Sequence, residues 1–145
     1  MDYFTAMDIS ATGLDLEKAR LDIVALNIAN ANTTSNSLNQ VYRPLTITAE
    51  PMANSFEAQL AGKLDNLPYA GVAIESIDYS NSQPRKIFEP GHSDADINGF
   101  VFSPDINLTA EMLNLISAKR SYEANIKVIS AAKTMAERAL EIGGR

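Results

Sequence analysis

Residues 111–140 read EMLNLISAKRSYEANIKVISAAKTMAERAL, and this segment decides the predicted fold. Its apolar residues recur in alternating steps of four and three, the heptad spacing of a helix that packs along one stripe against another helix. The predicted stripe comprises Leu108, Met112, Leu115, Tyr122, Ile126, Ile129, Ala136 and Leu140. Two further positions of the same stripe are basic, Lys119 and Lys133. The spacing predicts a helix with a seam for a second helix.

The ends of this helix are marked by residues that start and stop helices. Pro104 and Asp105 precede the run, and Gly143 and Gly144 follow it. Between these signals a helix of about 35 residues would be about 50 Å long at 1.5 Å per residue. That is far longer than the average globular helix of about 11–12 residues. The seam therefore needs a correspondingly long partner surface.

The first partner is a second helix predicted over residues 8–32 near the other end of the chain. Leu14, Leu21 and Ile28 recur every seven residues, and Val24 stands three residues after Leu21. Gly13 weakens the first part of this helix. The predicted helix is about 15 Å shorter than the one at the other end of the chain. Part of the longer seam would stay uncovered, and an uncovered apolar stripe favours a partner.

Asparagines gather where the first helix is expected to end. Asn27, Asn30 and Asn32 lie within LNIANAN, residues 26–32. Asparagine closes helices and forms turns readily, which explains Asn32 well. Asn27 and Asn30 fall a turn earlier, where an asparagine can instead hydrogen-bond a neighbouring helix. The sequence leaves both interpretations open, helix ending with solvation or polar contacts between helices.

The middle of the chain differs in character, since all six prolines lie within residues 38–104. Short alternating runs predict strands at 42–48, 72–74, 77–79 and 86–88, with a slip after residue 74 that suggests a bulge. Asn98-Gly99 before Phe100 is a hairpin signal. The predicted fold class is therefore α+β, with long terminal helices in an α-helical coiled coil and a small inserted β-rich module. We expect a helical domain formed by 1–35 and 106–145, and a module over 36–105 with a flexible loop near 50–70.

Composition excludes several functional classes. The chain has 145 residues, a net charge of −6 and no cysteine. An acidic chain offers no electrostatic footprint for nucleic acid and is repelled by anionic membranes, so we expect neither nucleic-acid binding nor membrane insertion. The N-terminus lacks the basic and apolar regions of a cleaved signal peptide. Nothing in the sequence indicates a disulfide framework or a thiolate metal site.

Candidate catalytic and metal sites are weak. DADINGFVFSPD, residues 94–105, approaches a calcium loop, but position twelve is Asp105 rather than glutamate and the flanks resemble strands. We favour a turn and hairpin over a calcium site. His92 is the only histidine, and no phosphate-binding glycine motif occurs. We therefore expect no enzyme activity, no catalytic residue, no cofactor and no metal.

Four segments in order carry a resemblance to a known family. LDIVALNIANANT (21–33), VYRP (41–44), IFEPGHSDADINGFV (87–101) and the segment at 111–140 together resemble the flagellar basal-body rod proteins. The short length and the segment at 87–101 make the chain most similar to the C-type proximal rod proteins, the FlgC family. The N-terminal segment alone is shared by rod, hook and hook-associated proteins. The resemblance covers nearly the whole chain apart from residues 50–70.

The resemblance implies a structural subunit of the bacterial flagellar basal-body proximal rod. Its terminal helices would polymerise into a hollow drive shaft that transmits torque and conducts exported proteins. Implied partners are copies of itself, other proximal and distal rod subunits and, during secretion, the flagellar type III export apparatus. The implied location is the periplasmic rod, reached without a cleaved signal peptide. The alternative is a soluble coiled-coil adaptor protein, with helices that are stable at any concentration.

Under the rod interpretation, the expected subunit interface and helix seam follow from the predicted stripes. Those residues are Leu14, Leu21, Val24, Ile28, Met112, Leu115, Tyr122, Ile126, Ile129 and Leu140, with Asn27, Asn30 and Asn32 as the polar part of the motif.

Overall fold

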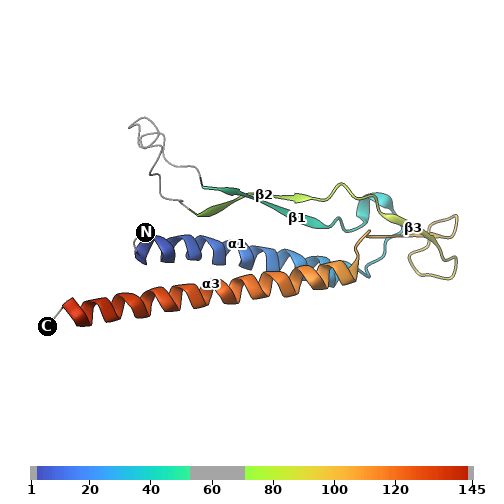
Figure 1. The fold of residues 1–145 in the computed structure, drawn as a ribbon. Coiled ribbons are helices and arrows are strands. Elements are labelled where there is room, and N and C mark those ends of the chain that lie inside the picture. Colours follow the sequence, from blue (N-terminus) through green and yellow to red (C-terminus); the bar gives the residue numbers. More distant parts are fainter. Residues whose placement is uncertain (1–2, 53–70, 144–145) are drawn as a thin grey trace, which may run out of the picture. The chain divides into compact units, whose positions relative to one another are not determined.

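The structure is a computed structural model that describes residues 3–52 and 71–143. Along the chain it contains α1 (Tyr3–Asn30), a 3-10 turn (Leu38–Gln40), β1 (Leu45–Pro51), β2 (Val72–Tyr79), β3 (Arg85–Phe88), β4 (Phe100–Ser103) and α3 (Leu108–Gly143) (Figure 1). Two long helices with short strands between them in sequence confirm the α+β class. The flexible loop predicted near 50–70 falls almost wholly outside the described residues.

Helix α3 extends over 36 residues, close to the predicted span. Its N-terminus is capped by Asn107, whose side-chain Oδ1 accepts the backbone N–H groups of Thr109 (3.0 Å) and Ala110 (3.2 Å). Glu111 lies in the first turn, where a carboxylate interacts favourably with the helix dipole. The helix begins three residues after Asp105 and ends at Gly143. The predicted stop signal is confirmed, whereas the cap at Asn107 was not anticipated.

Helix α1 extends over 28 residues and begins at Tyr3, five residues before the predicted start. Gly13 lies inside it without interrupting it. At the other end the carbonyl of Asn30 accepts both the backbone N–H (3.1 Å) and the hydroxyl (2.7 Å) of Thr33. The chain then leaves the helix, and Ser35 exchanges two backbone hydrogen bonds with Phe102.

The strands form two separate two-stranded sheets, β1 with β2 and β3 with β4. β3 and β4 are antiparallel, with Arg85 opposite Ser103 and Phe88 opposite Phe100. β2 is one continuous strand, where the sequence pattern had predicted two pieces with a slip between them. Gly71 precedes β2 with φ +96°, a conformation that glycine adopts without steric cost. The predicted hairpin therefore exists, with residues 89–99 as its connection.

The chain divides into two compact units, and α1, α3, β1 and β2 each contribute residues to both. Unit 1 contains residues 1–19, 49–75 and 118–145, and unit 2 contains 20–48 and 76–117. The described core of unit 1 is small and includes Leu16, Ala118 and Ala132. The core of unit 2 is larger and comprises Ile23, Val24, Ala31, Val41, Val101 and Ile106. Buried polar residues occur in both units, Ser10 and Glu17 in the first and Asn27 and Ser103 in the second.

Candidate helix seam and subunit-contact surface

The inward-facing residues of α3 form a stripe with heptad spacing. Buried or half-buried positions alternate in steps of four and three from residue 111 to residue 136. They are Glu111, Leu115, Ala118, Tyr122, Asn125, Ile129, Ala132 and Ala136. This spacing is typical of a helix that packs lengthwise against another helix. Half of the stripe matches the predicted one, because Leu115, Tyr122, Ile129 and Ala136 occupy the expected positions.

The other half of the predicted α3 stripe lies on the outside. Met112 and Ile126 are 52% and 45% exposed and lie one residue further along the helix than the inward positions 111 and 125. Leu140 is 76% exposed and lies beyond the last covered position, residue 136. Lys119 and Lys133 are outside as well and approach Glu123 and Glu137 of the same helix at 3.8 Å. The sequence contains two possible stripes on α3 that are one residue apart. Where they differ, the prediction followed the larger side chains, whereas packing within the chain buries the neighbouring positions.

Small side chains on α1 and α3 allow the two helices to approach closely in unit 1. In unit 1 a Cβ on Gly13 of α1 would lie 2.8 Å from Nδ2 of Asn125 in α3. Ala118 and Ala132, the buried positions on α3, are also small. Close approach of α1 at these positions leaves room only for small side chains there. The larger Leu115, Tyr122 and Ile129 alternate with the small residues along the same stripe.

On α1 the predicted stripe is partly inward. Val24 is buried, and Leu14, Leu21 and Ile28 are half-buried. Leu16 and Ile23, which the predicted stripe did not include, are more deeply buried than Leu14, Leu21 and Ile28. Their spacing of seven residues was a usable signal. α1 thus buries a broader face than one narrow stripe.

Asn27 is the most completely bonded polar side chain of unit 2 and is only 3% exposed. Its Oδ1 accepts the backbone N–H of Leu45 (2.9 Å) and the hydroxyl of Tyr42 (2.9 Å). Its Nδ2 donates to the carbonyl of Leu45 (3.0 Å) and, more weakly, to Glu111 of α3 (3.5 Å). One side chain therefore links α1, the start of β1 and α3. We call Asn27, Tyr42, Leu45 and Glu111 the Asn27 hub.

The other two asparagines behave differently. Nδ2 of Asn30 donates to the carbonyl of Leu26 on the same helix (2.8 Å), and Asn32 is exposed in the turn after α1. Of the two interpretations open from sequence, helix ending holds for Asn30 and Asn32. Asn27 fits neither interpretation fully, because its main partners are Leu45 and Tyr42 and only its 3.5 Å bond to Glu111 reaches a neighbouring helix. The burial of its side chain distinguishes it from its neighbours.

The hub extends the neutral form of Tyr42 to higher pH. Burial raises the pKa of the Tyr42 phenol, and Tyr79 and Glu111 raise it further because a negative charge on either neighbour disfavours a phenolate. The neutral hydroxyl is the form that can donate to Oδ1 of Asn27. Leu45 N–H and Tyr42 O–H together occupy both acceptor positions of that oxygen.

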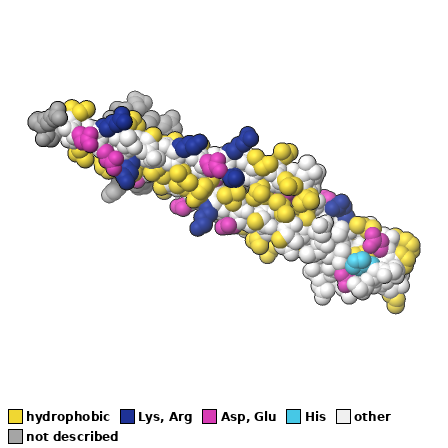
Figure 2. All heavy atoms as spheres, turned by 90° about the horizontal axis from the view of Figure 1, so that it is seen from below, with side chains coloured by type: hydrophobic (Ala, Val, Ile, Leu, Met, Phe, Trp, Pro, Cys, Tyr) yellow, Lys and Arg dark blue, Asp and Glu magenta, His cyan; other side chains and the backbone are white. Residues whose placement is uncertain are grey.

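Many large apolar side chains are exposed among the described residues. Nineteen of them are exposed, against nine hydrophobic residues in the core, so the described fold leaves more apolar surface open than an isolated monomer usually does. Figure 2 shows hydrophobic side chains lying between Lys, Arg, Asp and Glu on one face. Helix α3 supplies many of them, namely Leu108, Met112, Leu113, Ile116, Ile126, Val128, Met135, Leu140 and Ile142.

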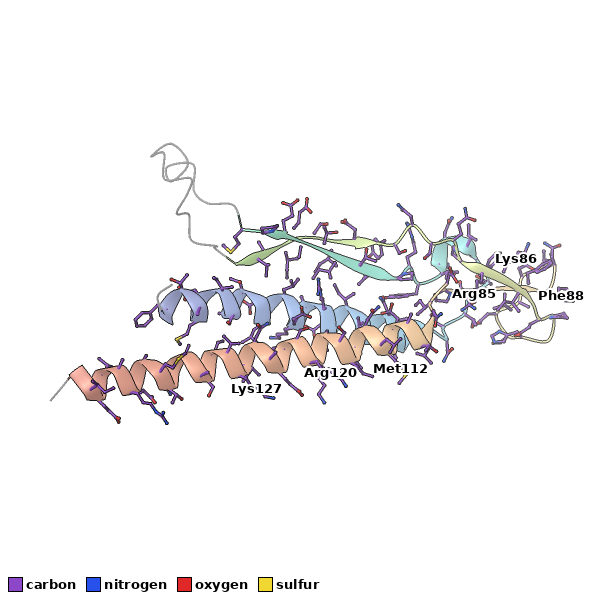
Figure 3. The ribbon with its side chains drawn as sticks, in the orientation of Figure 1. Arg85, Lys86, Phe88, Met112, Arg120 and Lys127 are labelled. Carbon is purple, nitrogen blue, oxygen red and sulfur yellow. The ribbon has the colours of Figure 1, made fainter. Side chains whose placement is uncertain are left out.

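The β3–β4 hairpin carries an aromatic cluster. The Phe88 and Phe100 rings meet edge to face, with centroids 5.2 Å apart. The ammonium group of Lys86 lies 4.0 Å from the centre of the Phe100 ring and 5.7 Å from that of Phe102, within cation–π range. Figure 3 labels Lys86 and Phe88 at this end of unit 2. Phe88 itself remains exposed.

The carboxylates of the segment 94–105 point to separate partners. Oδ1 of Asp96 accepts the backbone N–H groups of Phe100 (2.9 Å) and Asn98 (2.7 Å), which lowers its pKa. Asp94 accepts from Thr34 (2.5 Å), and Asp105 pairs with Arg85 (3.5 Å). The lone His92 accepts the backbone N–H of Asp94 at Nδ1 (3.1 Å). Within residues 3–52 and 71–143, no group of three or more His, Cys, Asp or Glu residues could hold a metal ion.

Membrane insertion finds no support in the helices. None of those in the described part of the chain combines the length and the apolar character needed to span a bilayer.

Comparison with known proteins adds an independent finding. The family described as "Flagella basal body rod protein" matches residues 7–35, and the family described as "Flagellar basal body rod FlgEFG protein C-terminal" matches residues 97–142. These two segments contain most of α1 and nearly all of α3.

Similar proteins extend the match to the whole chain. The chain is 34% identical to the flagellar basal-body rod protein FlgC of Borreliella burgdorferi, with 98% of each chain covered. It is 32% identical to the FlgC proteins of Bacillus subtilis and Salmonella typhimurium, with 99% of each chain covered. The length, the helical termini and the middle segment all match together. The chain therefore belongs to the FlgC family of flagellar basal-body rod proteins.

Proposed function

We propose that the chain is a structural subunit of the proximal rod in the bacterial flagellar basal body. It polymerises through its terminal helices into the hollow drive shaft that transmits torque and conducts exported proteins. The observation that carries this proposal is the row of large apolar side chains left exposed along α3. Membership of a family of rod proteins supports the same function and favours a structural role over catalysis.

The proposed architecture assigns the helices to assembly. Residues 1–35 and 106–145 form a helical rod-core domain with coiled-coil packing, and residues 36–105 form an inserted β-rich module. The heptad spacing of the inner α3 stripe supports the coiled coil. Long helices with exposed apolar stripes suit repeated asymmetric contacts, which build helical assemblies rather than closed dimers.

The proposed site residues fall into two groups. Leu14, Leu21, Val24, Ile28, Leu115, Tyr122 and Ile129 pack within the chain, and Asn27, Asn30 and Asn32 hold the end of α1 and its neighbours. Met112, Ile126 and Leu140 contact neighbouring subunits, a role that their exposure supports. Burial of an exposed leucine or isoleucine contributes about 1.5–3 kcal/mol when the side chain is fully covered. Several such residues per subunit would stabilise a polymer strongly.

The proposed partners are copies of this chain and other proximal and distal rod proteins. During secretion the chain is passed by the flagellar type III export apparatus to the periplasmic rod. The names of the relatives, which are basal-body rod proteins, support the location in the basal body.

A charge placed on the exposed face of α3 tests this function. Ile116→Asp would introduce a carboxylate at an exposed apolar position, and Asn114→Asp introduces the same group at an exposed polar position of the same helix. Each variant is expressed in a motile bacterium lacking its own family member. We expect Asn114→Asp to restore swimming and to be recovered in isolated basal bodies, whereas Ile116→Asp is absent from them. Equal recovery of both variants contradicts the proposed role of the apolar face.

A further inference from the structure

The outward face of α1 in unit 1 carries a regular row of side chains. Phe4, Asp8, Ala11, Asp15 and Lys18 alternate in steps of four and three, and all five are exposed. Asp8 and Asp15 are seven residues apart and therefore occupy the same position on the helix surface. We call these two carboxylates the acidic row. Asp22, a further seven residues along the same helix, is exposed too.

The outward face of α3 in unit 1 carries a row of the opposite charge. Arg120 and Lys127 are also seven residues apart and exposed, and we call them the basic row. The intervening outward positions are small, Ala124 and Ala131. Figure 3 shows Arg120 and Lys127 projecting from the side of α3 that faces away from α1. Both rows thus lie opposite the surfaces at which the two helices meet.

Neither row is neutralised within the described part of the chain. Asp8, Asp15, Arg120 and Lys127 take part in no hydrogen bond or ion pair among the described residues. The other two lysines of α3 in this unit differ, because Lys119 and Lys133 each pair with a glutamate four residues further on. Within the part of α3 in this unit, the two lysines outside the row are thus paired, whereas both cations of the row are not.

We propose that the acidic row of one chain docks on the basic row of a second copy of the same chain. The inference rests on the proposed rod function and specifies which helix faces meet. Two carboxylates and two cations with the same seven-residue spacing are complementary in both charge and repeat. Since the rows lie on different helices and point away from the intrachain contact, docking is head to tail and can continue from copy to copy.

The surroundings of the rows suit close packing of two helices. Ala11 lies between the carboxylates, and Ala124 lies between the cations. These small side chains leave room for residues of a partner helix, as at the seam of a coiled coil. Val128 and Met135 are exposed one residue beyond Lys127 and Thr134, and they provide apolar contact beside the charges. Opposite charges at the edges of such a seam set partner choice and orientation.

Charge reversal distinguishes a second copy from any other partner. The first variant is Asp8→Lys/Asp15→Lys, and the second is Arg120→Glu/Lys127→Glu. Each is expressed alone, and both are expressed together, in a bacterium lacking its own family member. Each variant alone places like charges against each other, so we expect recovery in isolated basal bodies to fall at least about tenfold. Together, the reversed acidic row of one meets the reversed basic row of the other, and recovery returns.

A matched control separates the row from net charge. Arg43→Glu/Arg85→Glu changes the net charge by the same amount as Arg120→Glu/Lys127→Glu, and both arginines are exposed and lie outside the two helices. We expect this control to be recovered like the parent chain. Far-UV circular dichroism of each purified variant checks that its helix content is unchanged.

Three outcomes overturn the inference. If the control is lost as strongly as the row variants, net charge rather than the row governs assembly. If each row variant is lost and co-expression fails to restore recovery, the rows dock on a different protein. If both row variants are recovered normally, the rod function stands and the row contact is wrong. Failure of the unchanged chain to enter basal bodies would instead remove the rod function, and this inference with it.

Discussion

The two units join α1 to α3 through different chemistry. In unit 2 a buried asparagine, Asn27, bonds β1, Tyr42 and α3 at once. In unit 1 the contact is a close approach between Gly13 and the side chain of Asn125. A buried polar group requires each of its partners in place, so the hub fixes one geometry. A small residue limits only how near the helices can come, which leaves the contact of unit 1 less restrictive.

The largest expected effect tests the hub itself. Asn27→Ala leaves the backbone N–H and carbonyl of Leu45 and the hydroxyl of Tyr42 without partners in a buried setting. Unpaired buried groups cost about 1–3 kcal/mol each, so the free energy of unfolding should fall by about 3 kcal/mol. Urea titration followed by circular dichroism measures the change, here and in the predictions below, at one fixed protein concentration at which the chains are associated and the terminal helices are formed. Asn30→Ala is the control and should lose less than about 0.5 kcal/mol, since Asn30 bonds only its own helix at an exposed position. Equal losses in the two variants would rule out a special role for the hub.

A smaller effect separates the members of the hub. Tyr42→Phe removes one hydroxyl, while Oδ1 of Asn27 keeps the N–H of Leu45, so we expect a loss of about 1 kcal/mol. The raised pKa of Tyr42 also predicts a pH effect, because its contribution is present below pH ~10 and is lost as the pH rises through the folded-state pKa. Urea titrations between pH 8 and pH 11 should show a steeper decline for the parent chain than for the variant. Parallel declines would show that Tyr42 is not held neutral by the hub.

Substitution at the contact of unit 1 should change the free energy of unfolding much less than substitution in the hub. Gly13→Ala improves helix propensity by up to about 1 kcal/mol, but the added methyl displaces the amide of Asn125, the end of a flexible side chain. We expect stability within about 0.5 kcal/mol of the parent chain. In the Asn125→Ala background the same substitution should stabilise by about 1 kcal/mol, because the obstruction is gone. A loss above about 2 kcal/mol for Gly13→Ala alone would show that unit 1 is as tightly specified as unit 2.

The smallest expected effect concerns an acceptor at the surface. Asp96 accepts two backbone N–H groups as Asn27 does, but in an exposed loop. Its pKa lies below the ordinary value, first because of the N–H of Phe100, so its contribution is present above pH ~4 and is lost as the pH falls through the folded-state pKa. Asp96→Ala should therefore reduce the loss of stability between pH 5 and pH 3, measured by urea titration. An identical acid response in both chains would contradict this.

The helices could be predicted from the sequence because their signals are long and repeated. Heptad spacing over the C-terminal third and stop residues at Gly143 and Gly144 located α3 within a few residues. The inward phase of α3 was not predictable from apolar residues alone, since Met112 and Ile126 lie on one stripe and Ala118 and Ala132 on the adjacent one. Which stripe turns inward depends on how near α1 comes. That distance is set by Gly13 and Asn125, which are far apart in sequence.

The polar features show the same limit. An asparagine in a helix indicates a polar role, but only the distant Tyr42 and Leu45 make Asn27 a buried hub. The cap at Asn107 was readable in principle, as an asparagine directly before the helix, yet Pro104 and Asp105 offered an equally good start. Sequence therefore located the elements and the family, and the choice among local alternatives required the packing.

Limited proteolysis with far-UV circular dichroism, on the dilute purified chain and on assembled basal bodies, tests the central claim most directly. The claim is that the terminal helices leave apolar faces that other subunits cover. We predict that segments 1–35 and 106–145 are cleaved first in the dilute chain, with low helicity, and become protected on assembly. Helical and protected ends at every concentration would mean that the two helices satisfy each other. That result would contradict the rod-subunit account and favour a coiled-coil adaptor.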